Sequence, residues 1–221
     1  VSDKIGMDFI GTLEMDGIIP IMIELEQFIG RKITWVSGET FDELIVRKGN
    51  YLPNLMARYC TTEIKMKPIF EWWMGSVGEV CSMRIGFRFG EEDRMSRMND
   101  KLNANGFDTY KAVIGTRKTQ NKWGNVEWRI PEFPLITDRI MKDTIDAYWE
   151  KQTVPFFKGY YNNCVGCFHK NPLLLSMMNR DNSQKMKWFE RKEQETGNRF
   201  RKEITFEQIN KWKPYAELDF S

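Results

Sequence analysis

The chain has 221 residues, of which 41% are hydrophobic and 29% charged, a composition typical of one sizeable α/β domain or two small ones. Its net charge of +2 gives no argument for a nucleic-acid partner, and its longest apolar run, Ile18–Ile23, is too short to cross a bilayer. Four cysteines are too few for a disulfide scaffold in a chain of this length. We therefore expect a protein of the reducing cytoplasm with no membrane partner.

The first fifty residues predict alternating strands and helices. A short apolar patch predicts a strand within residues 5–13, and helical spacing predicts a helix over 20–29 that stops at Gly30. Residues 32–36 are expected to form a strand, and a capping-box pattern opens a short helix over 40–46. Strands and helices in this rhythm favour parallel pairing and an α/β sheet.

The rest of the chain predicts fewer strands. In chain order we expect a loop carrying Cys60, a helix over 68–74, a strand within 78–89 and a solvated helix over 91–102. Residues 105–131 are expected to be irregular, with a hairpin turn at 121–125. Three further helices are expected over 137–151, over 183–196 and from 205.

Two cysteines and the chain's single histidine lie close together in the sequence. Cys164 and Cys167 form a CxxC pair around Gly166, and His169 follows two residues later. Such thiols can bind a metal or an iron–sulfur cluster, or close a small disulfide; we favour a ligand or redox role. Cys60 could join them, although an inert thiol is an equally good interpretation for Cys60 alone. Cys81, inside an apolar strand, is predicted to be a buried structural thiol.

Three cations stand where strands or loops are expected to end. Arg58 and Lys65 flank Cys60, and Arg88 closes the strand ending near Gly86. Anionic ligands bind at such ends in open α/β sheets, whereas a solvated surface charge is the commoner role of any single cation. No Gly-rich phosphate loop of the GxGxxG, GxxxxGK[ST] or SGGxDS type occurs in the sequence.

Four segments in order resemble the phosphoadenosine phosphosulfate (PAPS) reductase family. Residues 58–69 are similar to its R-x-C-x-x-x-x-K-x-x-P-I segment, and residues 86–94 to its G-[IV]-R-x-x-E segment. Residues 133–149 are similar to its "PL…W" stretch, and residues 163–170 to the N-C-x-G-C-[FP]-x-K segment of phage and bacterial members. Together they cover nearly the whole chain.

The resemblance implies one domain over residues 1–221, with an α/β sheet region at 1–150 and the CxxC loop and C-terminal helices at 151–221. The implied fold is Rossmann-like, of the adenine nucleotide α-hydrolase type. Thr12 falls in a segment similar to the family's T-x-x-E, which normally follows the SGGxDS loop, so the chain is expected to lack the preceding strand, loop and helix. No cysteine stands in residues 211–221, where authentic reductases carry their nucleophile.

The resemblance also implies the ligands and the residues that bind them. ATP or an adenylyl sulfate would be the substrate, with an iron–sulfur cluster or zinc as cofactor and a nucleic acid or a small molecule as sulfur acceptor. The expected metal ligands are Cys60, Cys164, Cys167 and His169. Catalysis is assigned to Cys60, Lys65 and Arg88. The expected nucleotide contacts are Thr12, Arg58, Lys65, Arg88 and Glu92.

Two other functions are compatible with the sequence. The first is a catalytically inactive protein of the same fold, stabilised by zinc, that senses a nucleotide or binds a partner. The second is a nucleic-acid-binding module that uses the Lys/Arg-rich stretch 180–202. Glutamates interleaved in that stretch favour a plain solvated helix instead.

Overall fold

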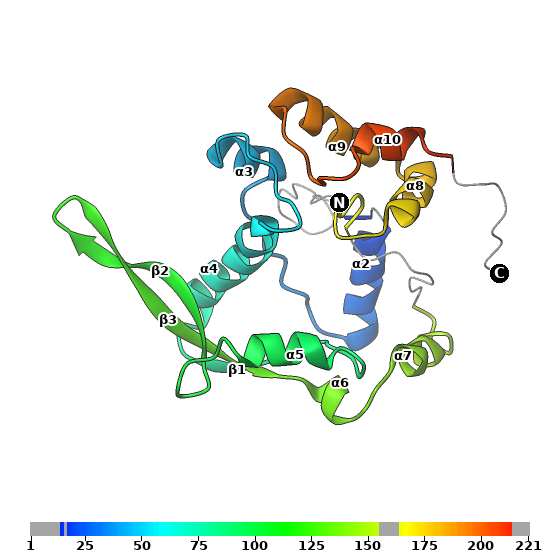
Figure 1. Ribbon diagram of the computed structural model, residues 1–221. Coiled ribbons are helices and arrows are strands. Elements are labelled where there is room, and N and C mark those ends of the chain that lie inside the picture. Colours follow the sequence, from blue (N-terminus) through cyan, green and yellow to red (C-terminus); the bar gives the residue numbers. More distant parts are fainter. Residues whose placement is uncertain (1–13, 16, 155–163, 214–221) are drawn as a thin grey trace. The chain divides into compact units, whose positions relative to one another are not determined.

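The computed structural model describes residues 14–15, 17–154 and 164–213, which form helices and one small sheet (Figure 1). The chain divides into two compact units, Val1–Pro68 with Phe157–Ser221, and Ile69–Phe156. The strand expected within 5–13 and the expected nucleotide contact Thr12 lie outside the described residues. Among the described residues, no helix is both long enough and apolar enough to span a membrane.

The sheet belongs to the unit Ile69–Phe156 and has three strands in the order β1-β3-β2. Strand β1 (Cys81–Arg84) pairs parallel with β3 (Gln120–Glu132), and β2 (Asp108–Arg117) pairs antiparallel with β3. The chain is therefore a mixed α/β protein with a mixed sheet. Parallel pairing, which the sequence predicted for strands of the first fifty residues, occurs between β1 and β3, and the antiparallel pair of β2 and β3 agrees with the hairpin turn expected near 121–125.

The region expected to be irregular is a long hairpin. Strands β2 and β3 are joined at Lys118 and Thr119, a few residues before the turn expected at 121–125 (Figure 1). Its polar free end hides the alternation that identifies a strand, so the sequence pattern did not reveal it. Strand β1 has only four residues, fewer than the stretch 78–89 suggested.

Aromatic side chains fix the base of the hairpin. Helix α4 (Lys67–Ser76) presents Phe70, which stacks on Tyr110 with ring centroids 4.4 Å apart and meets Trp128 edge-on at 5.7 Å. Trp73 meets the same Trp128 ring at 6.0 Å. Arg129, almost fully buried, pairs with Asp108 at 2.7 Å, so its charge is compensated. The base of the hairpin, where β3 pairs with β1, is thus held by a packed core.

The remaining helices of this unit lie at its surface. Helix α5 (Glu92–Asn99) has no buried residue, in line with the solvated helix predicted there. The helix expected over 137–151 is shorter, α7 (Lys142–Trp149), and Thr137 instead ends a separate short helix, α6 (Pro134–Thr137). Arg139 lies between them with a left-handed φ of 55°, which an α-helix cannot contain.

The unit Val1–Pro68 with Phe157–Ser221 contains the larger apolar core. Helices α3 (Phe41–Arg47), α8 (Pro172–Asp181), α9 (Ser183–Thr196) and α10 (Phe206–Lys211) all contribute to it. Glu193 is a buried carboxylate among these side chains, and it accepts the backbone N–H groups of Phe200 and Phe206 at 3.1 and 2.7 Å. Fully buried core residues are Leu52, Val165, Leu175, Met178, Met186, Phe200, Phe206 and Ile209.

Helix α2 (Ile18–Ile29) confirms the helix predicted over 20–29. It begins two residues earlier and ends at Gly30, whose φ of 64° is left-handed as a glycine stop requires. The strand predicted at 32–36 is wrong, because residues 32–40 form neither strand nor helix. The backbone N–H of Ile33 donates to the Glu26 carboxylate at 2.7 Å instead of to a neighbouring strand.

Candidate functional site

The CxxC loop is anchored in the core by the residues between and beside its cysteines. Val165 and Phe168 are buried, so Cys164 and Cys167 are held in place by apolar packing. Gly166 has a φ of 67°, and a Cβ on it would stand 2.2 Å from the Phe189 ring. Only glycine fits there, because both the backbone conformation and the space exclude a side chain.

Two cations hold the carbonyl groups of this loop. Lys170 is buried, and its ammonium group donates to the Cys164 carbonyl at 2.5 Å. Arg201 donates through Nη1 to the carbonyls of Phe168 and Lys170, the latter at 3.0 Å. The loop carbonyls therefore accept hydrogen bonds from Lys170 at the end of the loop and from Arg201, about thirty residues further along the chain.

Cys60 lies on a helix, not in the loop expected from the sequence. It directly precedes the π-helix η1 (Thr61–Met66), which continues into α4. Its thiol is half-buried. The loop prediction was wrong because Pro53 and the polar residues around Cys60 are typical of a loop, whereas π-helices have no simple sequence pattern.

One cavity brings the three expected thiols together. Its volume is about 120 Å³, and its wall includes Cys60, Cys164 and Cys167 together with Arg58 and Lys65. All of them belong to the same compact unit. The rest of the lining comes from Glu14, from residues 36–41, from η1 and from the core. These residues are Glu14, Val36, Ser37, Gly38, Glu39, Thr40, Phe41, Thr61, Ile64, Phe168 and Phe189.

The three thiols differ in their electrostatic surroundings. The neighbouring Cys164 thiol lowers the pKa of Cys167, and the backbone N–H of His169 and the Arg58 charge act in the same direction. The interaction with Cys167 and burial raise the pKa of Cys164. Burial raises the pKa of Cys60, with Arg58 opposing it. Cys167 is thus the thiol most readily ionised.

The cations of the cavity have different partners. Lys65 is ion-paired with Glu14 at 3.0 Å. Glu14 also forms an isolated antiparallel bridge with Cys164, which fixes this contact beside the CxxC loop. Arg58 is exposed and makes no ion pair with any described residue, although its charge acts on Cys60 and Cys167. An anion entering the cavity would meet Arg58 directly and would compete with Glu14 for Lys65.

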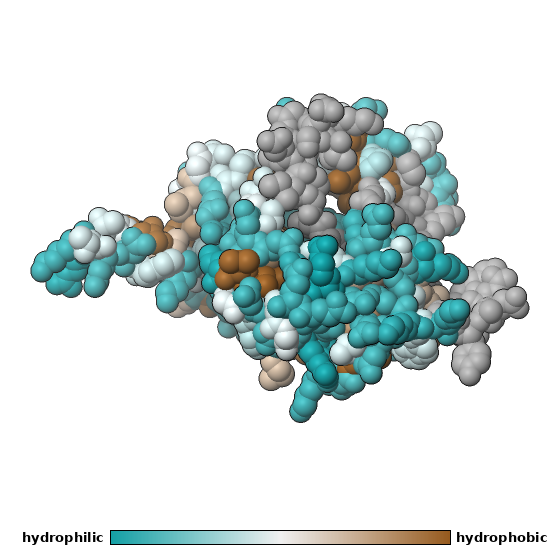
Figure 2. Space-filling view, turned by 90° about the horizontal axis from the view of Figure 1, so that it is seen from above, coloured by the Kyte–Doolittle hydropathy of each residue, from teal (hydrophilic) through white to brown (hydrophobic). Residues whose placement is uncertain are grey.

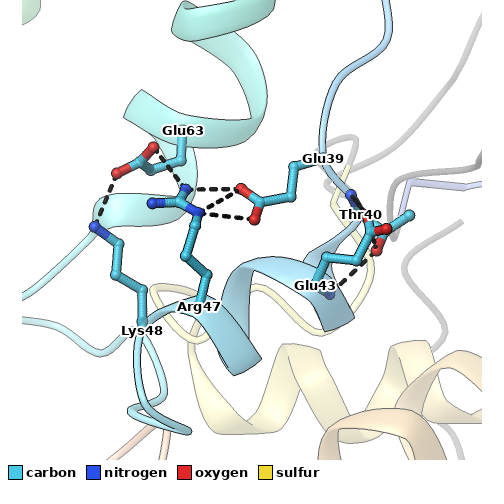
Figure 3. A network of polar contacts seen from close by, with 6 residues as sticks. All are labelled: Glu39, Thr40, Glu43, Arg47, Lys48 and Glu63. Carbon is cyan, nitrogen blue, oxygen red and sulfur yellow. Dashed lines mark hydrogen bonds and ion pairs between the residues drawn. The ribbon is translucent and has the colours of Figure 1, made fainter. Parts of the chain in front are cut away.

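A network of ion pairs connects the cavity wall to η1 (Figure 3). Arg47 of α3 pairs with Glu39 at 2.7 Å and with Glu63 of η1 at 2.9 Å, and Lys48 pairs with the other oxygen of Glu63 at 2.9 Å. A capping box between Thr40 and Glu43 begins α3, as the sequence predicted. The network ties the segment 39–48 to the helix that carries Lys65.

Other expected site residues lie elsewhere. His169 is exposed and does not line the cavity, and its ring is 4.9 Å from the Phe168 ring. Arg88 and Glu92 belong to the other unit, where Arg88 pairs with Glu91 at 3.2 Å and Glu92 accepts from the Gly90 N–H at 3.0 Å. Cys81, on β1, is partly buried rather than fully buried.

The donor set of the cavity fits a thiophilic metal or an iron–sulfur cluster in its chemistry. Thiolates are preferred by zinc, copper(I) and iron–sulfur clusters, and three of them share one small space. Within the described part of the chain, no group of three or more His, Cys, Asp or Glu side chains is arranged to hold a metal ion. The three residues that would hold the group are Cys60, Cys164 and Cys167.

Comparison with protein-family models, with curated proteins and with solved structures gave no match. The assignment of a function is therefore argued from the residues and the geometry of the cavity.

Three residues of the site were not predicted as such. Glu14 had a signal, because it closes the Thr12-Leu13-Glu14 segment that resembles the family's TLE, but its pairing with Lys65 could not be foreseen. Lys170 belongs to the N-C-x-G-C-[FP]-x-K segment, yet nothing in that pattern predicts its contact with the Cys164 carbonyl. Arg201 had no signal, since nothing in the local sequence relates it to the CxxC loop.

Proposed function

We propose that the protein is a PAPS reductase-like protein that binds an adenine nucleotide or sulfonucleotide and carries sulfur-transfer or redox chemistry on a three-cysteine site. The observation that supports this is the convergence of Cys60, Cys164 and Cys167 with two cations on one cavity. The proposal includes the Rossmann-like, adenine nucleotide α-hydrolase type of fold for the whole protein. It also places the protein in the cytoplasm, where its four free cysteines would stay reduced.

In this proposal each group of the cavity has one role. Cys60, Cys164 and Cys167 would hold an iron–sulfur cluster, which could bind sulfur or accept electrons, or zinc, which could bind sulfur only. Arg58 and Lys65 attract and orient the anionic end of the nucleotide. Lys170 and Arg201 keep the CxxC loop in place through its carbonyl groups. A nucleic acid or a small molecule would accept the sulfur.

The cavity volume limits what the described residues can enclose. Pockets for whole small-molecule ligands measure about 300–1,000 Å³, several times the 120 Å³ of this cavity. The proposal therefore assigns the cavity to the metal or cluster and to the reacting phosphate or sulfate group. The adenosine part of the ligand would bind beyond the cavity.

The metal assignment is tested by anaerobic purification followed by iron, sulfide and zinc analysis and an absorbance spectrum. We expect Cys60→Ser, Cys164→Ser and Cys167→Ser each to lower the metal content by at least about tenfold, the scale of effect expected at metal sites. The matched control is Cys81→Ser, because Cys81 is the one remaining cysteine and does not line the cavity. Metal-free protein, before and after reconstitution with iron and sulfide or with zinc, would refute the assignment.

The nucleotide assignment is tested separately by calorimetric titration with ATP and with adenylyl sulfate. Arg58→Ala should weaken binding of both by about tenfold, because a charge-assisted contact contributes roughly 1.5–3 kcal/mol. Arg139→Ala, a change of the same charge in the other unit, is the control. Equal affinity for the Arg58 variant and the original protein would contradict the proposed anion position.

A structural zinc site is the second candidate, favoured by one observation. Val165 and Phe168, the neighbours of the two CxxC cysteines, belong to the apolar core, so any metal bound there would be coupled to folding. This candidate predicts zinc without iron, a lower melting temperature for Cys164→Ser and no ATP turnover. Detection of a cluster spectrum would exclude it.

A further inference from the structure

The free end of the β2–β3 hairpin has no core of its own. Every residue from Val113 to Trp123 is exposed, and the hairpin extends away from the rest of its unit (Figure 1). Its end is mainly hydrophilic, with hydrophobic side chains further back (Figure 2). Exposed fractions are 40% for Val113, 51% for Ile114 and 58% for Trp123. A two-stranded ribbon without a packed face gains little from such residues, so their role is sought in binding.

The charge of this free end has one sign. Residues 109–126 contain Lys111, Arg117, Lys118 and Lys122 and no acidic residue. All four are exposed, and none forms an ion pair with any part of the chain that the structure describes. The whole chain has a net charge of only +2, so this is a local concentration of positive charge. Such a surface attracts a polyanion.

Strand register places an aromatic ring beside a cation on one face of the ribbon. Val113 pairs directly with Trp123, and Lys111 pairs with Asn125 two residues further along each strand. Residues two apart on a strand share a face, so Lys111 and Asn125 flank the Trp123 ring. On the opposite face Ile114 covers Gly124, where a Cβ would stand 2.6 Å from it. The face with Trp123 is therefore free to receive a ligand.

The turn retains a lysine where the backbone favours glycine. Lys118 has a φ of 56°, a left-handed conformation that costs a non-glycine residue about 1–2 kcal/mol. Glycine or asparagine is the usual residue at such a hairpin position. The folding of the hairpin therefore gives no reason for a lysine there, whereas binding of an anion does.

We propose that the free end of the β2–β3 hairpin binds single-stranded nucleic acid. Trp123 stacks on a base, Lys111, Arg117, Lys118 and Lys122 contact phosphates, and the Asn125 amide hydrogen-bonds a base edge. Stacking needs an unpaired base, which favours a single strand over a duplex. The proposal is independent of the thiol cavity, since it uses residues of the other unit only.

The test uses the full chain and fluorescence anisotropy of labelled oligo(dT) and oligo(U) of about 20 nucleotides, with a duplex of the same length for comparison. We expect the single strands to bind more tightly than the duplex, and a preference between oligo(dT) and oligo(U) to identify the natural strand. The logarithm of the affinity should fall with the logarithm of the salt concentration with a slope of about −3, from four phosphate contacts at about 0.7 each.

Three variants separate the contributions. Trp123→Ala should lose about tenfold or more in affinity and Trp123→Phe should keep most of it, since a ring is what stacks. Lys118→Gly should weaken binding and reduce the salt slope by about 0.7 while leaving the hairpin at least as stable. The matched control is the double change Lys187→Gln with Arg191→Gln on α9, which removes two exposed cations elsewhere and should leave binding unchanged.

Four results would overturn the proposal: no binding at low salt, tighter binding of the duplex, an unchanged affinity for Trp123→Ala, or loss of binding in the α9 control. Equal binding of heparin, a polyanion without bases, combined with an unchanged Trp123→Ala variant, would point to charge attraction alone. Size-exclusion chromatography with light scattering tests a second copy as the occupant. A dimer that Trp123→Ala dissolves would also refute the proposal.

Discussion

The thiol cavity and the free end of the hairpin are built in opposite ways. The cavity is assembled from segments near residues 14, 36–41, 58–65 and 164–168, each anchored by the apolar core or by ion pairs. The hairpin end is local, because its two strands pair with each other across one turn and its residues 113–123 are exposed among the described residues. A change in the cavity should therefore disturb folding and function together, whereas a change at the hairpin end should affect binding alone.

The largest effect in the cavity should come from Gly166, its tightest point. We expect Gly166→Ala to destabilise the protein by about 3 kcal/mol or more, because strain from the left-handed backbone adds to overlap with Phe189. Gly197→Ala is the matched control. Gly197 has nearly the same φ of 65° but open space around it, so only the strain, about 1 kcal/mol, should remain. Equal losses in urea unfolding would show that the Phe189 contact is unimportant.

Glu193 should give the next largest effect. Glu193→Ala leaves the buried N–H groups of Phe200 and Phe206 without an acceptor, at a cost of about 2–3 kcal/mol. Burial raises the pKa of Glu193 despite these hydrogen bonds. In this pH range the folded state binds more protons than the unfolded state. The free energy of unfolding therefore falls as the pH rises from the ordinary glutamate pKa through the folded-state pKa. Urea unfolding between pH 4 and 8, with exposed Glu195→Ala as control, checks both the loss and the sign.

A smaller, acid-dependent effect is expected in the other unit, at Glu91. Burial acts to raise its pKa, but hydrogen bonds from the Arg88 N–H and from the side chains of Arg94 and Arg88 outweigh it and bring the pKa to about 2. The lowered pKa stabilises the folded state above pH 4.5, and this contribution is lost as the pH falls toward 2.

Glu91→Gln should remove that pH dependence. At neutral pH the cost should be about 1 kcal/mol or less, because the arginine partners are largely solvated. Hydrogen exchange measured on residues 85–99 localises the effect to this unit, with exposed Asp93→Asn as control. A pH profile unchanged by Glu91→Gln would refute the assignment.

The smallest effect should come from the hairpin end. Trp123→Ala should change the free energy of unfolding by less than about 0.5 kcal/mol, because the ring is exposed. Trp128→Ala, five residues along the same strand, should cost about 3–5 kcal/mol, because that ring is buried against Phe70 and Trp73. A large loss of stability for Trp123→Ala would mean that the hairpin end packs against something and would weaken the contrast between the two regions.

Sequence reasoning succeeded where structure is determined locally. The capping boxes at Thr40 and Thr205 and the glycine stops at Gly30 and Gly197 identified α3, α10 and the ends of α2 and α9, because each signal involves residues within one turn. The break at Arg139 and the π-helix after Cys60 were missed, since neither leaves a simple pattern in the sequence. Helix α8 had a local signal, Asn171 followed by Pro172, that was not used.

The candidate site was predicted only in part for a similar reason. The motifs identified Arg58, Cys60, Lys65, Cys164 and Cys167, all of which line the cavity. They could not identify Arg201 or the pairing of Lys65 with Glu14, because contacts across many residues leave no periodic pattern. The motifs also suggested His169, whose side chain is exposed because its immediate neighbours Phe168 and Lys170 take the buried positions.

The π-helix before α4 makes the cavity sensitive to chain length. Cys60 and Lys65 are five residues apart, close to one π turn, whereas in an α-helix they would differ by about 140° around the axis. Deleting a single residue between Thr61 and Ile64 would place the two side chains four residues apart, which in an α-helix is about 40° around the axis and keeps both on one face. Inserting a residue would place them six apart, about 120° around an α-helix, and would turn one of them out of the cavity. Insertions in this stretch, rather than single deletions, should therefore mark divergence of function among homologues.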